Sequence, residues 1–107
     1  MSIQQLPPKI CSEIISREKE IQCIDVREPY EYELGNIGFV NIPMGETPII
    51  SEQFDKEKQT IILCRSGKRA EAVANLLSTE YNFTSIIIVE GGITAWKEAI
   101  DDSIQLD

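Results

Sequence analysis

The sequence contains no histidine among its 107 residues. A chain without histidine cannot form a Ser-His-Asp or Cys-His catalytic arrangement, and it cannot bind a metal ion through imidazole. Cysteine is scarce, at positions 11, 23 and 64, and no two cysteines form a CxxC pair. An odd number at these spacings is not typical of a disulfide framework or a zinc site. We therefore expect free thiols, no metal and no organic cofactor, in a reducing compartment.

Long apolar runs are missing as well. No run approaches the ~20 residues that a membrane-spanning helix needs. The first residues lack a basic segment followed by an apolar one, so we expect no secretory signal and a cytoplasmic location. Acidic residues outnumber basic ones by 18 to 10, and the net charge is −8. A chain of this charge is a poor general ligand for nucleic acids or anionic membranes, so we expect neither as a partner.

The remaining pattern predicts one domain, residues 1–107, in which short apolar strands alternate with helices. Residues 101–107 (DDSIQLD) are expected to form an acidic tail. The alternation predicts an α/β fold with a central five-stranded, mostly parallel sheet and helices on both faces. The expected strands are 3–6, 21–26, 39–42, 60–63 and 85–89, and the expected helical segments are 8–18, 29–34, 49–54, 70–81 and 93–100.

The loop after the strand at 60–63 carries the most distinctive chemistry. It reads CRSGKR, from Cys64 to Arg69, and leads into a helix. Ligands bind beyond the carboxyl ends of such strands, and the first N–H groups of a helix can bind an anion. Arg65, Lys68 and Arg69 are electrostatically unfavourable at a helix N-terminus unless an anion accompanies them. The loop therefore predicts an anion site in which Cys64 is a thiolate nucleophile activated without histidine.

The loop also admits a purely structural interpretation. A single cysteine at a strand end is usually a small core residue, and basic residues near a helix start are usually solvated. The thiol, the glycine, the three cations and the strand-to-helix switch within six residues together favour function. Loop length favours a particular chemistry, because the four residues between Cys64 and Arg69 are one fewer than in phosphatase-type loops. The tighter pocket suits a small group carried on the sulfur itself.

The sequence resembles that of a single-domain rhodanese, of the thiosulfate sulfurtransferase family. Four stretches in the family's order carry the resemblance and, with the strands between them, cover nearly the whole chain: IDVREPYEYELGNI (24–37), NIP (41–43), IILCRSGKRA (61–70) and EGGITAW (90–96). The resemblance implies a rhodanese-like fold. It also implies that Cys64 takes the sulfane sulfur of thiosulfate or a similar anionic donor, holds it as a persulfide and passes it to cyanide or a thiol.

The resemblance also assigns roles around Cys64. The backbone amides of Arg65, Ser66, Gly67, Lys68 and Arg69 would cradle the persulfide, and the three cations would orient the donor. Two positions depart from the family pattern. Asn36 stands where the family usually has histidine, in a segment that is one residue shorter, and Ala70 stands where it often has Ser or Thr.

The remaining candidates are interpreted as structural. Asp25 and Arg27 end a strand beside the expected site, where a supporting ion pair is favoured over a chemical role. Cys23 and Cys11 are expected to be core thiols, and no sequence feature supports a second cysteine that resolves the persulfide.

Two other functions stay open at this point. The first is a sulfur-relay module that receives persulfide sulfur from a partner protein and docks a basic partner on its acidic surface. The second is a small phosphatase or arsenate reductase that uses the same thiolate, against which the loop length argues.

Overall fold

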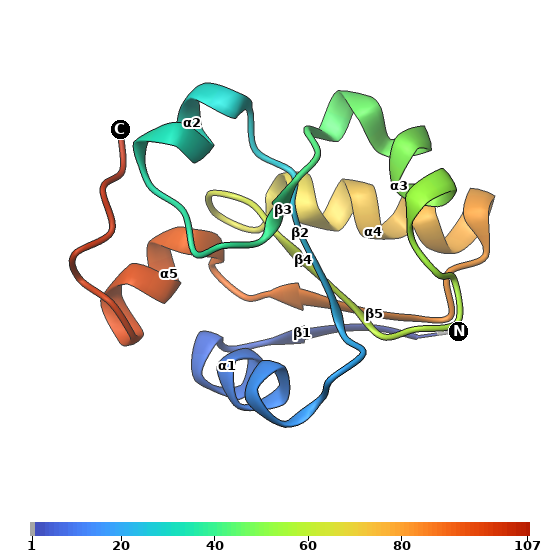
Figure 1. The fold of residues 1–107 in the computed structure, drawn as a ribbon, viewed down its shortest axis with the longest axis horizontal. Coiled ribbons are helices and arrows are strands. Elements are labelled where there is room, and N and C mark those ends of the chain that lie inside the picture. Colours follow the sequence, from blue (N-terminus) through green and yellow to red (C-terminus); the bar gives the residue numbers. More distant parts are fainter. Residues whose placement is uncertain (1) are drawn as a thin grey trace.

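Five parallel strands form one sheet through the middle of the computed structural model, which describes residues 2–107 (Figure 1). Their order across the sheet is β1-β5-β4-β2-β3, and every neighbouring pair is parallel. The predicted five-stranded sheet is therefore confirmed. The strands are β1 (Ser2–Leu6), β2 (Gln22–Asp25), β3 (Val40–Asn41), β4 (Thr60–Leu63) and β5 (Ser85–Val89).

Helices cover both faces of the sheet, as the alternating pattern predicted (Figure 1). On one face α1 contacts α5, and on the other α3 contacts α4. No helix within residues 2–107 is both long enough and apolar enough to cross a membrane. The helices are α1 (Pro8–Arg17), α2 (Pro29–Leu34), the 3-10 helix η1 (Met44–Glu46), α3 (Thr47–Gln53), α4 (Lys68–Tyr81) and α5 (Gly92–Ala99).

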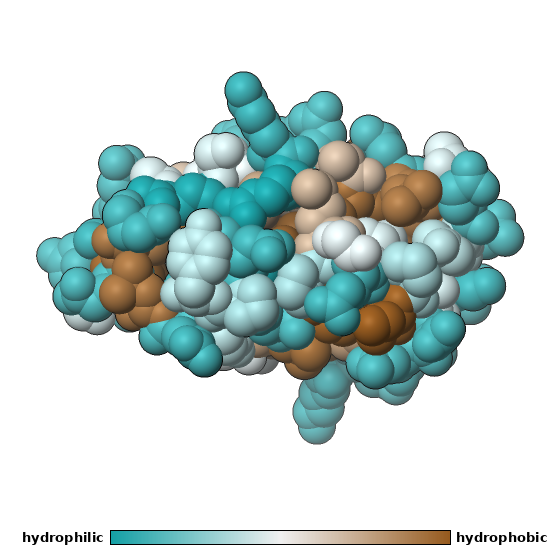
Figure 2. All heavy atoms as spheres, turned by 90° about the horizontal axis from the view of Figure 1, so that it is seen from above, coloured by the Kyte–Doolittle hydropathy of each residue, from teal (hydrophilic) through white to brown (hydrophobic). Residues whose placement is uncertain are grey.

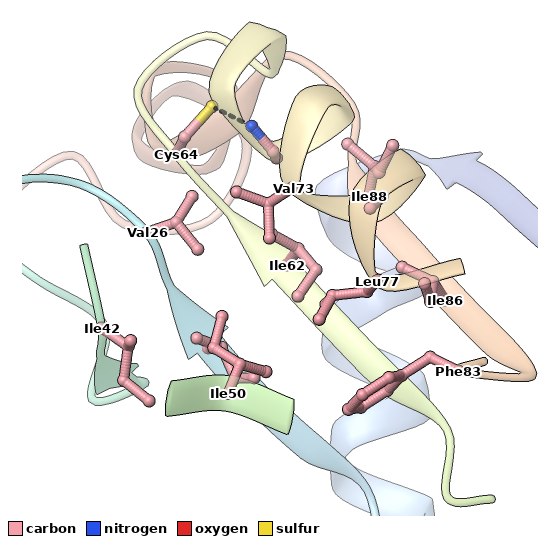
Figure 3. Close-up of a cluster of buried hydrophobic side chains, with 13 residues drawn as sticks. Val26, Ile42, Ile50, Ile62, Cys64, Val73, Leu77, Phe83, Ile86 and Ile88 are labelled. Atoms are coloured by element: carbon pink, nitrogen blue, oxygen red, sulfur yellow. Dashed lines mark hydrogen bonds between the residues drawn. The ribbon is translucent and has the colours of Figure 1, made fainter. Parts of the chain in front are cut away.

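The sheet divides the apolar core into two clusters. All four residues of β4 are buried, and its three apolar residues alternate between the clusters: Ile62 faces the α3–α4 side, whereas Ile61 and Leu63 face the α1–α5 side. A central parallel strand that is buried on both faces needs this continuous apolar sequence. Figure 3 shows Cys64 at the end of the α3–α4 cluster, beyond Val26. The core thus fixes the position from which the CRSGKR loop begins.

Element boundaries differ from the predictions where local geometry overrides the apolar pattern. The helix expected at 70–81 begins at Lys68, because Gly67 has a φ of 109° and turns the chain into the first helical turn earlier. The strand expected at 39–42 is confined to Val40–Asn41, and η1, which was not predicted, follows it. The ends of five other elements differ slightly from the prediction. The strands expected at 3–6 and 21–26 are Ser2–Leu6 and Gln22–Asp25. The helices expected at 8–18, 49–54 and 93–100 are Pro8–Arg17, Thr47–Gln53 and Gly92–Ala99.

The expected acidic tail lies against the rest of the protein. Ile104 is 6% exposed, and Leu106 packs against the α1–α5 cluster. The main chain of Gln105 passes Gly35 so closely that a Cβ at position 35 would lie 2.1 Å from the Gln105 carbonyl oxygen. Figure 1 shows the carboxyl-terminal end beside α2. Apolar burial of two side chains therefore holds this segment near the end of the sheet that carries Cys64.

Candidate active site

The Cys64 side chain lies where β4 gives way to α4, and it is 1% exposed. Its Sγ accepts hydrogen bonds from the backbone N–H of Gly67, at 3.0 Å, and of Ala70, at 3.3 Å. Figure 3 shows one of these contacts as a dashed line from the sulfur to a backbone nitrogen. Backbone donors and a helix N-terminus stabilise a thiolate relative to a thiol. The Cys64 sulfur therefore faces two backbone donors at the start of α4, in a chain that has no histidine.

The start of α4 adds further donors beside the sulfur. The N–H groups of Lys68 and Arg69 have no acceptor within residues 2–107. Such groups at a helix start are the ones that bind anions in proteins. The structure therefore leaves unpaired amides within the loop in which the resemblance placed its persulfide cradle.

The loop is held from behind by α5. The N–H of Ile93 donates to the Cys64 carbonyl at 2.8 Å, and the N–H of Thr94 donates to the Arg65 carbonyl at 3.2 Å. A Cβ at Gly92 would lie 2.3 Å from the Arg65 carbonyl oxygen, so only glycine permits this approach. The glycine pair in EGGITAW thus serves the backbone of the CRSGKR loop.

Arg69, predicted to orient the donor, is bound instead to a carboxylate of this chain. Its Nη1 and Nη2 donate to the two carboxylate oxygens of Glu31 at 2.7 and 2.9 Å. Glu31 is 6% exposed, and its Oε1 also accepts the N–H of Glu28, which caps α2. The hydrogen bonds from Arg69 lower the pKa of Glu31 from 4.5 to about 2, against the opposing effect of burial. Arg69 therefore joins α2 to the loop.

Arg65 is also paired. Its Nε donates to Thr94 Oγ1 at 3.1 Å, its Nη1 forms an ion pair with the Asp107 carboxylate, and its Nη2 donates to the Asp107 main-chain oxygen at 3.1 Å. Lys68 is exposed, and no ion-pair partner for it exists within residues 2–107. Of the three predicted cations, the structure thus leaves one without a carboxylate.

Sequence reasoning missed Glu31 and Asp107, the two partners of these arginines. The Glu28-Pro-Tyr-Glu31 spacing does fit a capping box, which predicts that the Glu31 side chain turns back toward the helix start. The capping-box spacing does not predict that the Glu31 carboxylate binds Arg69. Nothing local to Asp107 indicates that it would contact the loop.

Asp25 and Arg27 form the expected ion pair beneath the site. Both are almost fully buried, and the Nη2 of Arg27 lies 2.8 Å from Oδ2 of Asp25. The same guanidinium donates to the carbonyls of Glu31, at 3.3 Å, and of Gly35, at 2.9 Å. The pair therefore fixes α2, and through it the carboxylate that holds Arg69, without a hydrogen bond to Cys64.

The two departures from the family pattern have local structural roles. The Asn36 side chain donates to the Tyr32 carbonyl at 3.0 Å and accepts the N–H of Gly38 at 2.9 Å, so it shapes its own loop. Ala70 is fully buried, and it contributes its backbone N–H to the Cys64 sulfur.

The other two cysteines lie apart from this machinery. All three thiols are free. Burial raises the pKa of Cys11 to about 11, and burial together with the nearby Cys11 raises that of Cys23 to about 11. Thiols of this kind are protonated at neutral pH and are poor nucleophiles. Within residues 2–107, no group of three or more Cys, Asp or Glu residues is arranged to hold a metal ion.

Comparison with known proteins places this fold and loop in a family. Residues 8–99 match the Rhodanese-like domain. The putative sulfurtransferase YtwF of Bacillus subtilis is 38% identical over 98 residues, which are 91% of this chain and 93% of YtwF. The putative sulfur carrier protein YrkF of the same organism is 29% identical over 89% of this chain and 51% of its own length. The thiosulfate sulfurtransferase GlpE of Coxiella burnetii is 30% identical over 76% of each chain.

Solved structures agree. A rhodanese-related protein from Thermoplasma volcanium superposes with a TM-score of 0.75 and 31% identity, over 89% of this chain and 91% of that one. The protein therefore belongs to the rhodanese-like family, and the relatives that it resembles are named as known or putative sulfurtransferases and, in one case, as a putative sulfur carrier protein. The chain spans between 30% and 93% of the lengths of the first curated relatives that it matches.

Proposed function

We propose that the protein is a sulfurtransferase that moves a sulfane sulfur from thiosulfate or a similar donor to cyanide or a thiol acceptor through a persulfide on Cys64. In the first step the Cys64 thiolate attacks the outer sulfur of thiosulfate. A bond forms between Sγ and that sulfur, the bond inside thiosulfate breaks, and sulfite leaves with the electron pair. In the second step the acceptor takes the terminal sulfur, and the thiolate returns.

The observation that carries this proposal is the pair of backbone N–H groups directed at Cys64 Sγ from Gly67 and Ala70. These donors favour the charged nucleophile, and the unpaired amides of Lys68 and Arg69 lie at the same helix start to receive a second anionic sulfur. The names of the relatives YtwF and GlpE agree with this chemistry. The phosphatase alternative loses support, because Arg69, the residue that would close a phosphate loop, is bound to Glu31.

Intact-mass measurement tests the proposal directly. Wild-type protein treated with thiosulfate is expected to gain the mass of one sulfur atom, and cyanide should remove it as thiocyanate. Cys64→Ser should neither gain the sulfur nor form thiocyanate. Cys23→Ser is the matched control, because it removes a thiol outside the CRSGKR loop and should behave as wild type. Sulfur loading that persists in Cys64→Ser would refute the assignment of the nucleophile.

A sulfur-carrier role is the second candidate, and the similarity to YrkF favours it. In that case the persulfide on Cys64 comes from a partner protein, and thiosulfate is a poor donor. Loading by a cysteine desulfurase that is much faster than loading by thiosulfate would select this role. Equal or faster loading by thiosulfate would exclude it.

A further inference from the structure

The positive charges of the CRSGKR loop are nearly cancelled by carboxylates of this protein. The guanidinium of Arg69 is held by the Glu31 carboxylate, and that of Arg65 is held by the Asp107 carboxylate. Lys68 is exposed and carries the single positive charge of the loop that no carboxylate matches within residues 2–107. A negative charge on a Cys64 thiolate would in turn balance the positive charge of Lys68. The loop therefore offers an incoming anion little net attraction beyond its amides.

The elements packed near the loop carry further negative charge. Glu28 and Glu33 are exposed on either side of Glu31 in the sequence, and Glu46 is exposed on η1, which contacts α4. Figure 2 shows the face over α2 and α3, which is mostly hydrophilic with small separate apolar patches. The whole chain carries a net charge of −8. Each further unit of negative charge on a donor is therefore opposed, with an energy that falls with distance and added salt.

We propose that Asp107, by neutralising Arg65, is a specificity-determining residue that makes the site select a singly charged sulfane donor, such as an alkyl persulfide or thiosulfonate, over the doubly charged thiosulfate. Asp107 acts through Arg65, so it is a positioning residue for the donor. Glu31 favours the same singly charged donors, because it neutralises Arg69. This inference rests on the proposed sulfurtransferase function and defines the donor class for the same site.

The chemistry balances for each donor. With a persulfide R–S–S⁻, the Cys64 thiolate forms a bond to the terminal sulfur, the donor's S–S bond breaks, and the thiolate R–S⁻ leaves with the electron pair. With methanethiosulfonate, CH₃SO₂–S⁻, the same attack releases methanesulfinate. Neither step needs an oxidant, a reductant or a net proton. The two reactions differ from the thiosulfate reaction in the charge of donor and leaving group.

Methanethiosulfonate and thiosulfate make a closely matched pair of probes. They share the sulfonyl group and the sulfane sulfur, and a methyl group in one replaces a charged oxygen in the other. The measurement is kcat/KM for each donor with cyanide as the acceptor, expressed as the ratio of monoanion to dianion. Comparing this ratio between variants cancels the intrinsic reactivity of the donors.

In Asp107→Asn the ratio is expected to fall by about 3-fold to 10-fold, the size of effect that one surface charge produces at low salt. The change should come from a lower KM for thiosulfate with kcat nearly unchanged, and it should disappear near 1 M salt, where the screening length is about 3 Å. Glu31→Gln should move the ratio in the same direction. Glu20→Gln is the matched control, because Glu20 pairs with Lys58, 3.3 Å away, outside the loop.

The outcomes separate the two proposals. If neither donor loads the wild type, the proposed function fails, and this inference fails with it. If both donors load it but Asp107→Asn leaves the ratio unchanged, shifts it no more than Glu20→Gln does, or slows both donors equally, only the charge selection is refuted. Loading of wild type by an alkyl persulfide faster than by thiosulfate, with the ratio shift in Asp107→Asn, supports it.

Discussion

Replacing Glu31 by glutamine tests whether the contact between α2 and the loop is electrostatic. Glu31 is 6% exposed, and both its carboxylate oxygens accept hydrogen bonds from Arg69, so its pKa falls from 4.5 to about 2. A carboxyl whose pKa is lower in the folded state stabilises the protein above its unfolded-state pKa, and this contribution is lost as the pH falls through the folded-state pKa. The sensitive range therefore runs from about pH 5 down to about pH 2.

The size of the effect follows from the shift. The difference between 4.5 and about 2 corresponds to about 3 kcal/mol of folding free energy at pH 7. At pH 3 the unfolded chain has bound the proton while most folded molecules have not, and the same linkage leaves about 1 kcal/mol. Glutamine has no charge to titrate, so the variant lacks this contribution at every pH.

Urea unfolding followed by the fluorescence of the single tryptophan, Trp96, measures these free energies. Glu31→Gln is expected to be less stable than wild type by about 3 kcal/mol at pH 7 and by about 1 kcal/mol at pH 3. Glu33→Gln, at an exposed position on the same helix, should change stability by less than about 0.5 kcal/mol at both pH values. A deficit for Glu31→Gln that is the same at pH 7 and pH 3 would refute the electrostatic explanation.

Two further predictions concern the loop backbone and the buried thiols. Gly92→Ala should lower the free energy of unfolding by more than Gly38→Ala, for which backbone strain alone predicts a loss of about 1–2 kcal/mol. Gly92→Ala should also lose sulfur loading. Thermal unfolding measures the stabilities, and intact mass measures the loading. Both glycines have positive φ, but only at Gly92 would a Cβ meet backbone within 4 Å, so equal losses would contradict this account. Iodoacetamide should alkylate Cys11 and Cys23 slowly in the folded Cys64→Ser variant, with a rate that rises about tenfold per pH unit toward pH 11. Fast labelling at a rate independent of pH would mean that burial does not control the reactivity of these two thiols.

Much of the fold could be predicted because its determinants are local. The run TIIL in β4 is apolar on both faces, and the alternation of such strands with amphipathic helices admits few arrangements other than a parallel sheet. The position of Cys64 follows, because a residue after a central strand must lie at the ligand-binding edge. The failures are local as well: the pattern of apolar residues placed the start of α4 at Ala70, whereas the conformation of Gly67 sets it at Lys68.

The electrostatic state of the loop could not be predicted, because it depends on contacts between distant parts of the sequence. Glu31 lies 38 residues from Arg69, and Asp107 lies 42 residues from Arg65. With 18 acidic residues in the chain, no helical or strand spacing indicates which of them meets an arginine. Cations at a helix start need an accompanying anion, since the helix dipole opposes them. The structure meets that need for two of the three with the protein's own carboxylates. The motif therefore predicts the position of the proposed sulfur chemistry, whereas the tertiary fold determines how much positive charge remains for a donor.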